Sequence, residues 1–67
     1  MTQAPEFSIG FLRLAEVLRR VGLSKPKVYR LMKEDNFPRP RKVGRASLWR
    51  NDEIDRWIRS LPENEAL

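Results

Sequence analysis

Apolar residues recur at helical spacing in three segments of the chain, the first of them near the N-terminal end. Four residues there follow the i, i+3, i+4, i+7 spacing that places side chains on one face of a helix: Leu14, Val17, Leu18 and Val21. Gly22 comes next and predicts the end of this helix. Glu16 precedes Arg20 by four residues, so we expect a supporting ion pair between them.

A second helix is predicted after a short turn. Val28, Leu31 and Met32 repeat the i, i+3, i+4 spacing, and Ser24 is a favourable N-cap in front of them. Asp35-Asn36-Phe37-Pro38 then ends the helix. Two short helices joined by a short turn with a glycine are typical of a helix-turn-helix, although other small helical hairpins share this pattern.

After Pro40 the pattern changes to two short segments with β-forming residues on either side of Gly44-Arg45-Ala46. This arrangement predicts a hairpin over residues 41–50 with Arg45 near its tip. Beside a helix-turn-helix such a hairpin is a wing, and an arginine at its tip can reach a narrow minor groove or the phosphates next to it. The alternative is a hairpin that only covers the core.

The third helix has the clearest pattern of the three. Its apolar face is formed by residues at i, i+3, i+4, i+7: Ile54, Trp57, Ile58 and Leu61. Asp52 is expected to cap its start, and Pro62 ends it. Two acid-before-base pairs are expected on its polar face: Asp52 with Arg56 and Asp55 with Arg59. These pairs favour an intrahelical role for both arginines over contact with DNA.

The predicted fold is mainly α with a small β-hairpin: a winged helix-turn-helix of three short helices plus a wing. Residues 10–61 form this single DNA-binding domain. Residues 1–9 lack an apolar period and are expected to be a flexible N-terminal tail, and residues 62–67 an acidic C-terminal tail. Trp49 and Trp57 are interpreted mainly as core packing, with base stacking by an exposed tryptophan as the alternative.

Charge adds a functional prediction to this fold. The 67 residues carry a formal net charge of +5, which favours polyanionic partners. Residues 19–50 hold eleven basic and two acidic residues, a charge of +9, whereas the rest hold three basic and seven acidic residues, a charge of −4. So sharp a segregation favours phosphate binding over a merely solvated basic surface. With its apolar residues buried, the second helix presents a basic stripe of Pro26, Arg30 and Lys33, flanked by Lys27, Tyr29 and Glu34.

The chain contains neither histidine nor cysteine. This composition excludes zinc fingers, disulfides, an imidazole base and a thiolate nucleophile. We therefore expect no enzymatic activity, no metal and no cofactor. No apolar run approaches the roughly 18 residues of a membrane span, and residues 1–8 do not resemble a signal peptide. A cytoplasmic location without membrane contact is expected.

Several short motifs follow one another in a specific order: Phe11-Leu12-Arg13-Leu14-Ala15-Glu16-Val17, Val21-Gly22-Leu23-Ser24, Val28-Tyr29-Arg30-Leu31-Met32-Lys33, Phe37-Pro38-Arg39-Pro40, Gly44-Arg45-Ala46-Ser47, Trp49-Arg50, Glu53-Ile54 and Trp57-Ile58. In this order they resemble the AlpA family of phage and mobile-element regulators. That family is similar to MerR-type winged helix-turn-helix proteins and to excisionases, also called recombination directionality factors.

The resemblance implies a bacterial, phage or integrative-element protein of the nucleoid that binds double-stranded DNA near an attachment site or an integrase-gene promoter. As an excisionase it would bend the site so that a tyrosine recombinase (integrase) excises the element. The alternative is a transcriptional regulator of integrase, excisionase or other element genes. Neither role includes catalysis by the chain itself.

The resemblance also implies which residues contact DNA. The second helix is the major-groove reader, through Lys25, Pro26, Lys27, Tyr29, Arg30 and Lys33. The wing contacts the minor groove or phosphates through Arg41, Lys42, Arg45, Ser47 and Arg50, and Arg20 adds a supporting phosphate contact. Family members often carry Ser or Thr near the start of the recognition helix, where this chain has Lys25-Pro26-Lys27. Pro26 disfavours helical geometry at Lys25, which favours displacement of the first turn by a residue.

A single domain of this size reads only a few base pairs, so we expect cooperative self-association on adjacent sites or help from a partner protein. A hypothesis from another class is a protein-interaction module, in which the acidic tail or the third helix recruits a recombinase or RNA polymerase. This role is compatible with DNA binding. RNA binding is disfavoured because no platform of exposed aromatic residues alternates with the basic ones.

Overall fold

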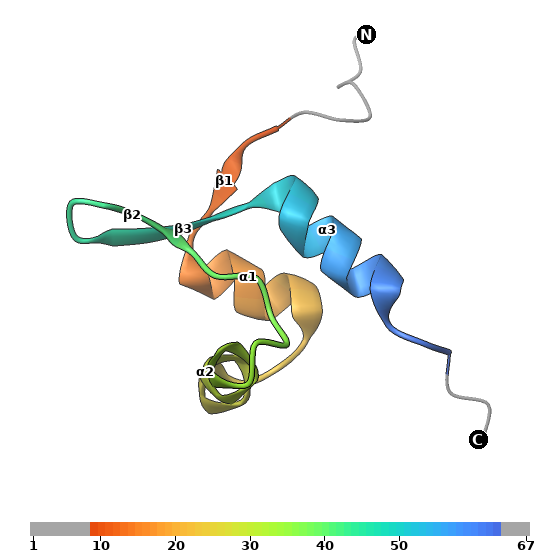
Figure 1. Ribbon diagram of the computed structural model, residues 1–67. Coiled ribbons are helices and arrows are strands. Elements are labelled where there is room, and N and C mark those ends of the chain that lie inside the picture. Colours follow the sequence, from red (N-terminus) through yellow and green to blue (C-terminus); the bar gives the residue numbers. More distant parts are fainter. Residues whose placement is uncertain (1–8, 64–67) are drawn as a thin grey trace, which may run out of the picture.

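The computed structural model describes residues 9–63, which form three helices and a small antiparallel sheet (Figure 1). In chain order the elements are β1 (Phe11–Leu12), α1 (Leu14–Val21), α2 (Lys25–Lys33), β2 (Arg41–Val43), β3 (Ala46–Arg50) and α3 (Asn51–Ser60). This architecture confirms the predicted winged helix-turn-helix. The tail predicted for residues 1–9, apart from Ile9, and the acidic tail beyond Glu63 lie outside the described residues. Within the described part, no helix is long and apolar enough to cross a membrane.

The helix-turn-helix consists of α1 and α2 with a turn at residues 22–24. Gly22 ends α1 as predicted, in the left-handed region at φ 71°, and its N–H donates to the Leu18 carbonyl at 2.8 Å. The predicted ion pair of Glu16 with Arg20 is wrong. Glu16 lies in the first turn of α1, where its carboxylate accepts the Arg13 backbone N–H at 3.0 Å, because unpaired N–H groups and the positive end of the helix dipole attract it.

Both ends of α2 are fixed by local hydrogen bonds. Ser24 is the N-cap, as predicted, and its Oγ accepts the Lys27 N–H at 3.4 Å. The helix begins at Lys25 without the displacement expected from Pro26, because an N–H is not needed in the first turn. At the other end Asp35 takes φ 61°, and the N–H groups of Asp35 and Asn36 donate to the carbonyls of Met32 and Leu31. This Schellman pattern ends the helix where the sequence predicted.

The wing is the hairpin of β2 and β3. Val43 lies opposite Ala46, so Gly44 and Arg45 form a two-residue loop with Arg45 at the tip, as predicted. Gly44 has φ 61°, the left-handed value that tight hairpin turns require at their first central position. β1 pairs with the other side of β3 and gives the strand order β1-β3-β2. This third strand was not predicted.

The start of α3 differs from the prediction. α3 follows β3 directly, so Arg50 occupies the N-cap position and Asp52 lies in the first turn. Asp52 pairs with Arg50, with a shortest contact of 2.7 Å, and not with Arg56 as expected. The predicted pair of Asp55 with Arg59 is confirmed at 2.9 Å.

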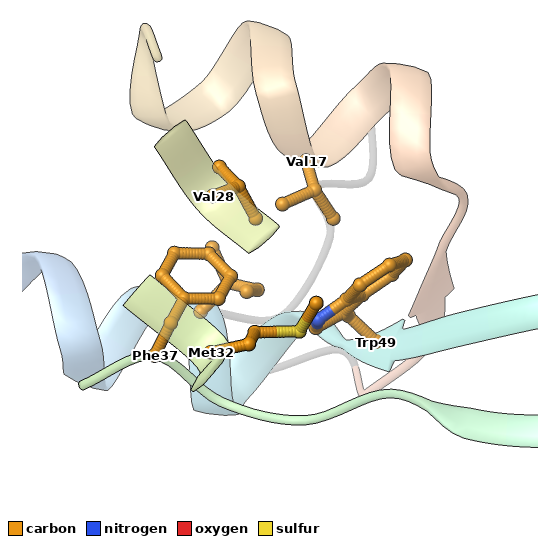
Figure 2. Close-up of a cluster of buried hydrophobic side chains, with 6 residues drawn as sticks. Val17, Val28, Met32, Phe37 and Trp49 are labelled. Atoms are coloured by element: carbon orange, nitrogen blue, oxygen red, sulfur yellow. The ribbon is translucent and has the colours of Figure 1, made fainter. Parts of the chain in front are cut away.

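Six buried side chains from all three helices, β3 and the loop after α2 form the core (Figure 2): Val17, Val28, Met32, Phe37, Trp49 and Ile54. Trp49 is fully buried, and its Nε1 donates to the Pro38 carbonyl at 3.0 Å, so it cannot stack on a base. Trp57 packs edge-on against Phe37 with ring centroids 4.7 Å apart. Both tryptophans therefore pack the core, as interpreted from the sequence.

Candidate nucleic-acid interface

The outer face of α2 presents all six side chains predicted for the major groove. Val28 and Met32 bury the inner face of the helix. The exposed side chains are Lys25, Pro26, Lys27, Tyr29, Arg30 and Lys33. In the described part of the chain, none of the four cations in this set forms an ion pair with a carboxylate. Their charge is therefore available to an external anion.

Two of these side chains also contact each other. The Lys25 Nζ lies 6.0 Å from the centre of the Tyr29 ring, at the outer limit of a cation–π interaction. Tyr29 is 41% exposed. Its hydroxyl can therefore donate to an oxygen atom of a bound phosphate.

The wing residues divide into two groups. Lys42 and Arg45 are exposed and have no carboxylate partner among residues 9–63. Figure 1 shows the hairpin projecting from the body of the molecule on the side opposite α3. Ser47 is half-buried in β3, opposite Lys42. Lys42 and the tip residue Arg45 are thus the wing cations best placed for an external partner.

The other two predicted wing residues are held by carboxylates of α3. Arg41 Nη1 donates to Glu53 Oε1 at 2.9 Å. Arg50 donates to both carboxylate oxygens of Asp52, from Nε at 2.9 Å and from Nη2 at 2.7 Å. Such a two-point geometry is the strongest form of an arginine–carboxylate contact. The base of the wing therefore presents less positive charge than the sequence predicts.

The Arg50–Asp52 contact shifts both titrations. The hydrogen bonds from Arg50, with its positive charge, lower the pKa of Asp52 below its usual value, although partial desolvation opposes the shift. The same hydrogen bonding and charge raise the pKa of Arg50. Both groups are consequently charged at neutral pH, and their charges offset each other locally.

Arg20, the predicted supporting contact, is exposed on α1. With Glu16 bound to the Arg13 N–H, Arg20 forms no ion pair within the described residues. Its charge is thus also available to a phosphate. The described residues contain no cluster of three or more His, Cys, Asp or Glu side chains that could hold a metal ion.

Arg39 is a candidate that the sequence reading did not select. Its side chain lies beside α2, where Nη2 donates to the Met32 carbonyl at 3.0 Å and to Asp35 Oδ1 at 2.7 Å. A surface hollow of about 410 Å³ lies next to it, lined by Tyr29, Met32, Lys33, Arg39 and Pro40. Arg39 follows the end of α2 by six residues and lies between two prolines, and this position gave no sequence signal that its side chain would lie along the helix.

Residues 10–61 match the family described as Prophage CP4-57 regulatory protein (AlpA). The match includes the helix-turn-helix, the wing and α3, and it covers most of the chain. A search of curated proteins gave no match. A search of solved structures likewise gave none.

Proposed function

The chain belongs to the AlpA family of phage-type DNA-binding regulators, and on this premise we propose that it is an excisionase that assembles on attachment-site DNA and promotes excision by a tyrosine recombinase. One observation carries the proposal: the outer face of α2 and the projecting tip of the wing carry cations without carboxylate partners in the described residues. Such a surface suits the phosphates and base edges of duplex DNA.

In this mechanism α2 is the recognition helix and enters the major groove. Arg30 and Lys33, with Lys27, donate to the N7 and O6 acceptors of guanine or to phosphates. Tyr29 donates its hydroxyl to a phosphate. Lys25 and Pro26, at the start of the helix, lie close to the DNA backbone.

The wing supplies the second line of contact. Arg45 reaches the flanking minor groove, and Lys42 holds the backbone beside it. Arg41 and Arg50 were predicted as further phosphate contacts. They contact phosphates through the guanidinium N–H groups that do not bond to Glu53 or Asp52. Ser47 adds a hydroxyl near Lys42, and Arg20 supports the complex from α1.

An excisionase of this kind performs no catalysis. It bends or organises the attachment site, and the recombinase cuts and joins the strands. Because one domain of this size reads few base pairs, several copies bind adjacent sites cooperatively. The energy of bending is offset by the added contacts between the bent duplex and these copies.

The second candidate function is transcriptional regulation of integrase, excisionase or other element genes. The description of the matched family as a regulatory protein favours it.

A protein-interaction role is compatible with either function. The tail residue Glu63 is exposed, whereas the α3 carboxylates Asp52, Glu53 and Asp55 are already paired with arginines. The tail is therefore the better recruiting segment for a recombinase or RNA polymerase.

Footprinting on the DNA around the chain's own gene and the nearest integrase gene tests the proposal. Regularly spaced protected repeats at an attachment site are the result expected of an excisionase. A single protected site at a promoter would contradict that role and favour the regulator.

Deleting the tail tests recruitment separately. Loss of excision or activation with unchanged DNA affinity is expected, and no effect of the deletion would contradict a recruiting role for the tail.

A further inference from the structure

The hollow beside α2 is lined by both polar and apolar side chains. Tyr29 and Lys33 stand four residues apart on the exposed face of α2, so their side chains are neighbours. Arg39 enters from the loop after the helix, and Met32 and Pro40 supply the apolar surface. Three donors from two separate segments thus surround one hollow of about 410 Å³.

Arg39 is fixed in position but not saturated. Both of its hydrogen bonds use Nη2, one to the Met32 carbonyl and one to Asp35. Its Nε and Nη1 have no partner among residues 9–63, and the side chain is 63% exposed. An arginine that is already oriented loses less conformational entropy when it binds a ligand.

The chemistry of the hollow fits a phosphodiester. Lys33 offers an ammonium, Arg39 two guanidinium donors and Tyr29 a hydroxyl, all of which donate to phosphate oxygens. The apolar side chains of Met32 and Pro40 suit the adjoining deoxyribose. Asp35 offsets part of the Arg39 charge, but its carboxylate is 82% exposed, so solvent screens it.

We propose that Tyr29, Lys33 and Arg39 form a binding site for one phosphodiester of the DNA backbone, at the junction of the recognition helix and the wing. This inference rests on the proposed DNA binding and adds Arg39 to its contacts. The site fixes the register of the duplex between the groove read by α2 and the groove reached by Arg45. If the DNA backbone were bound out of register, the contacts of α2 and those of Arg45 would be lost together.

The first test measures how the affinity for a short mixed-sequence duplex depends on salt, for the wild type, Arg39→Gln and Asp35→Asn. Each neutralised phosphate contributes about 0.9 to the slope of log K against log salt, so Arg39→Gln is expected to flatten the slope by up to about 0.9, with Lys33 retaining part of the neutralisation of the same phosphate. Asp35→Asn is the matched control: asparagine tolerates a φ of 61°, and the change leaves Arg39 charged. Its affinity is expected to equal or exceed that of the wild type.

The control separates a phosphate ligand from a merely structural arginine. If Arg39 only holds the loop through Asp35, both variants will weaken DNA binding alike, and that result would overturn the site. Circular dichroism and thermal unfolding of each variant show whether the fold is retained. If Arg39→Gln does not fold, a weakened affinity of Asp35→Asn alone still counts against the site, and an equal or tighter affinity supports it.

A second test replaces single phosphates of a footprinted duplex with neutral methylphosphonates. One position is expected at which the replacement weakens binding of the wild type more than that of Arg39→Gln. Equal losses for both proteins at every position would overturn the site while leaving DNA binding intact. If the duplex affinity of the wild type does not depend on salt, that result would instead overturn the proposed DNA binding, and the phosphodiester site would fall with it.

Discussion

At the scale of single residues, contacts with carboxylates determine how much positive charge each arginine presents to DNA. Arg41, Arg50 and Arg59 each contact a carboxylate of α3, whereas Arg30 and Arg45 have no such partner among residues 9–63. The sequence could not show this for Arg41, because Glu53 lies twelve residues away and meets it only because β2 pairs with β3, which leads directly into α3. Only the regular i, i+4 pair of Asp55 with Arg59 was predictable.

Arg30 and Arg59 form a matched pair for testing this distinction, since both are exposed helical arginines. Arg30→Ala is expected to weaken duplex binding by about 1–3 kcal/mol, or roughly fivefold to 150-fold, because α2 loses a base or phosphate contact. Arg59→Ala removes the same charge from α3 and is expected to change affinity little. Fluorescence anisotropy at fixed salt measures both, and equal losses would contradict the assignment of α2.

The Arg50–Asp52 contact predicts a dependence of stability on pH. Arg50 lowers the pKa of Asp52 below the usual 3.8, so the pair stabilises the fold above that pH, and this contribution is lost as the pH falls through the lowered value. Asp52→Asn is therefore expected to be less stable than the wild type at neutral pH and to approach it as the pH falls below the lowered pKa of Asp52. Urea unfolding across the acidic range measures this, and a difference independent of pH would contradict it.

At the scale of elements, the periodic segments were predictable and the junctions were not. All three helices and the hairpin follow from residue spacing, because each has one apolar face or one glycine-centred turn. β1 spans only Phe11–Leu12, too few residues to show an alternating pattern, and its pairing with β3 depends on the tertiary fold. The Asp52 cap failed because α3 follows β3 without a loop, and Asn51 Oδ1 accepts the Gly10 N–H at this junction.

The turn between α1 and α2 depends on the left-handed backbone of Gly22. No atom lies within 4 Å of a Cβ built there, so Gly22→Ala tests conformation alone, and a loss of about 1–2 kcal/mol in the free energy of unfolding is expected. Gly10→Ala is the control, since Gly10 also has open space but lacks a positive φ. Equal effects of the two changes in chemical denaturation would refute this explanation of the turn.

At the scale of the whole molecule, charge and size act together. The segment of residues 19–50, with its charge of +9, includes α2 and the wing. The acidic residues of α3 form ion pairs with arginines. All of the predicted contact residues on α2 are thus exposed, whereas only some of those on the wing are exposed and free of a carboxylate partner among residues 9–63. The location of the positive charge was predictable from the sequence, whereas its partial neutralisation by the carboxylates of α3 was not, because those contacts depend on the tertiary fold.

Small size predicts cooperativity on DNA. A duplex with two adjacent sites is expected to bind two copies more tightly than two isolated sites do, because neighbouring copies can contact each other. Gel-shift titration of one-site and two-site duplexes measures the difference. Strict one-to-one binding, unaffected by a neighbouring site, would contradict cooperative assembly.

If exposed, unpaired cations on α2 and the wing bind the DNA backbone and grooves, the affinity for duplex DNA must depend steeply on salt. Six predicted contact residues meet this description: Lys25, Lys27, Arg30, Lys33, Lys42 and Arg45. If they neutralise about six phosphates, log K falls with log salt at a slope of roughly −5, and Arg30→Ala and Arg45→Ala each flatten it. A shallow slope, or an affinity that neither substitution changes, would contradict this mode of binding.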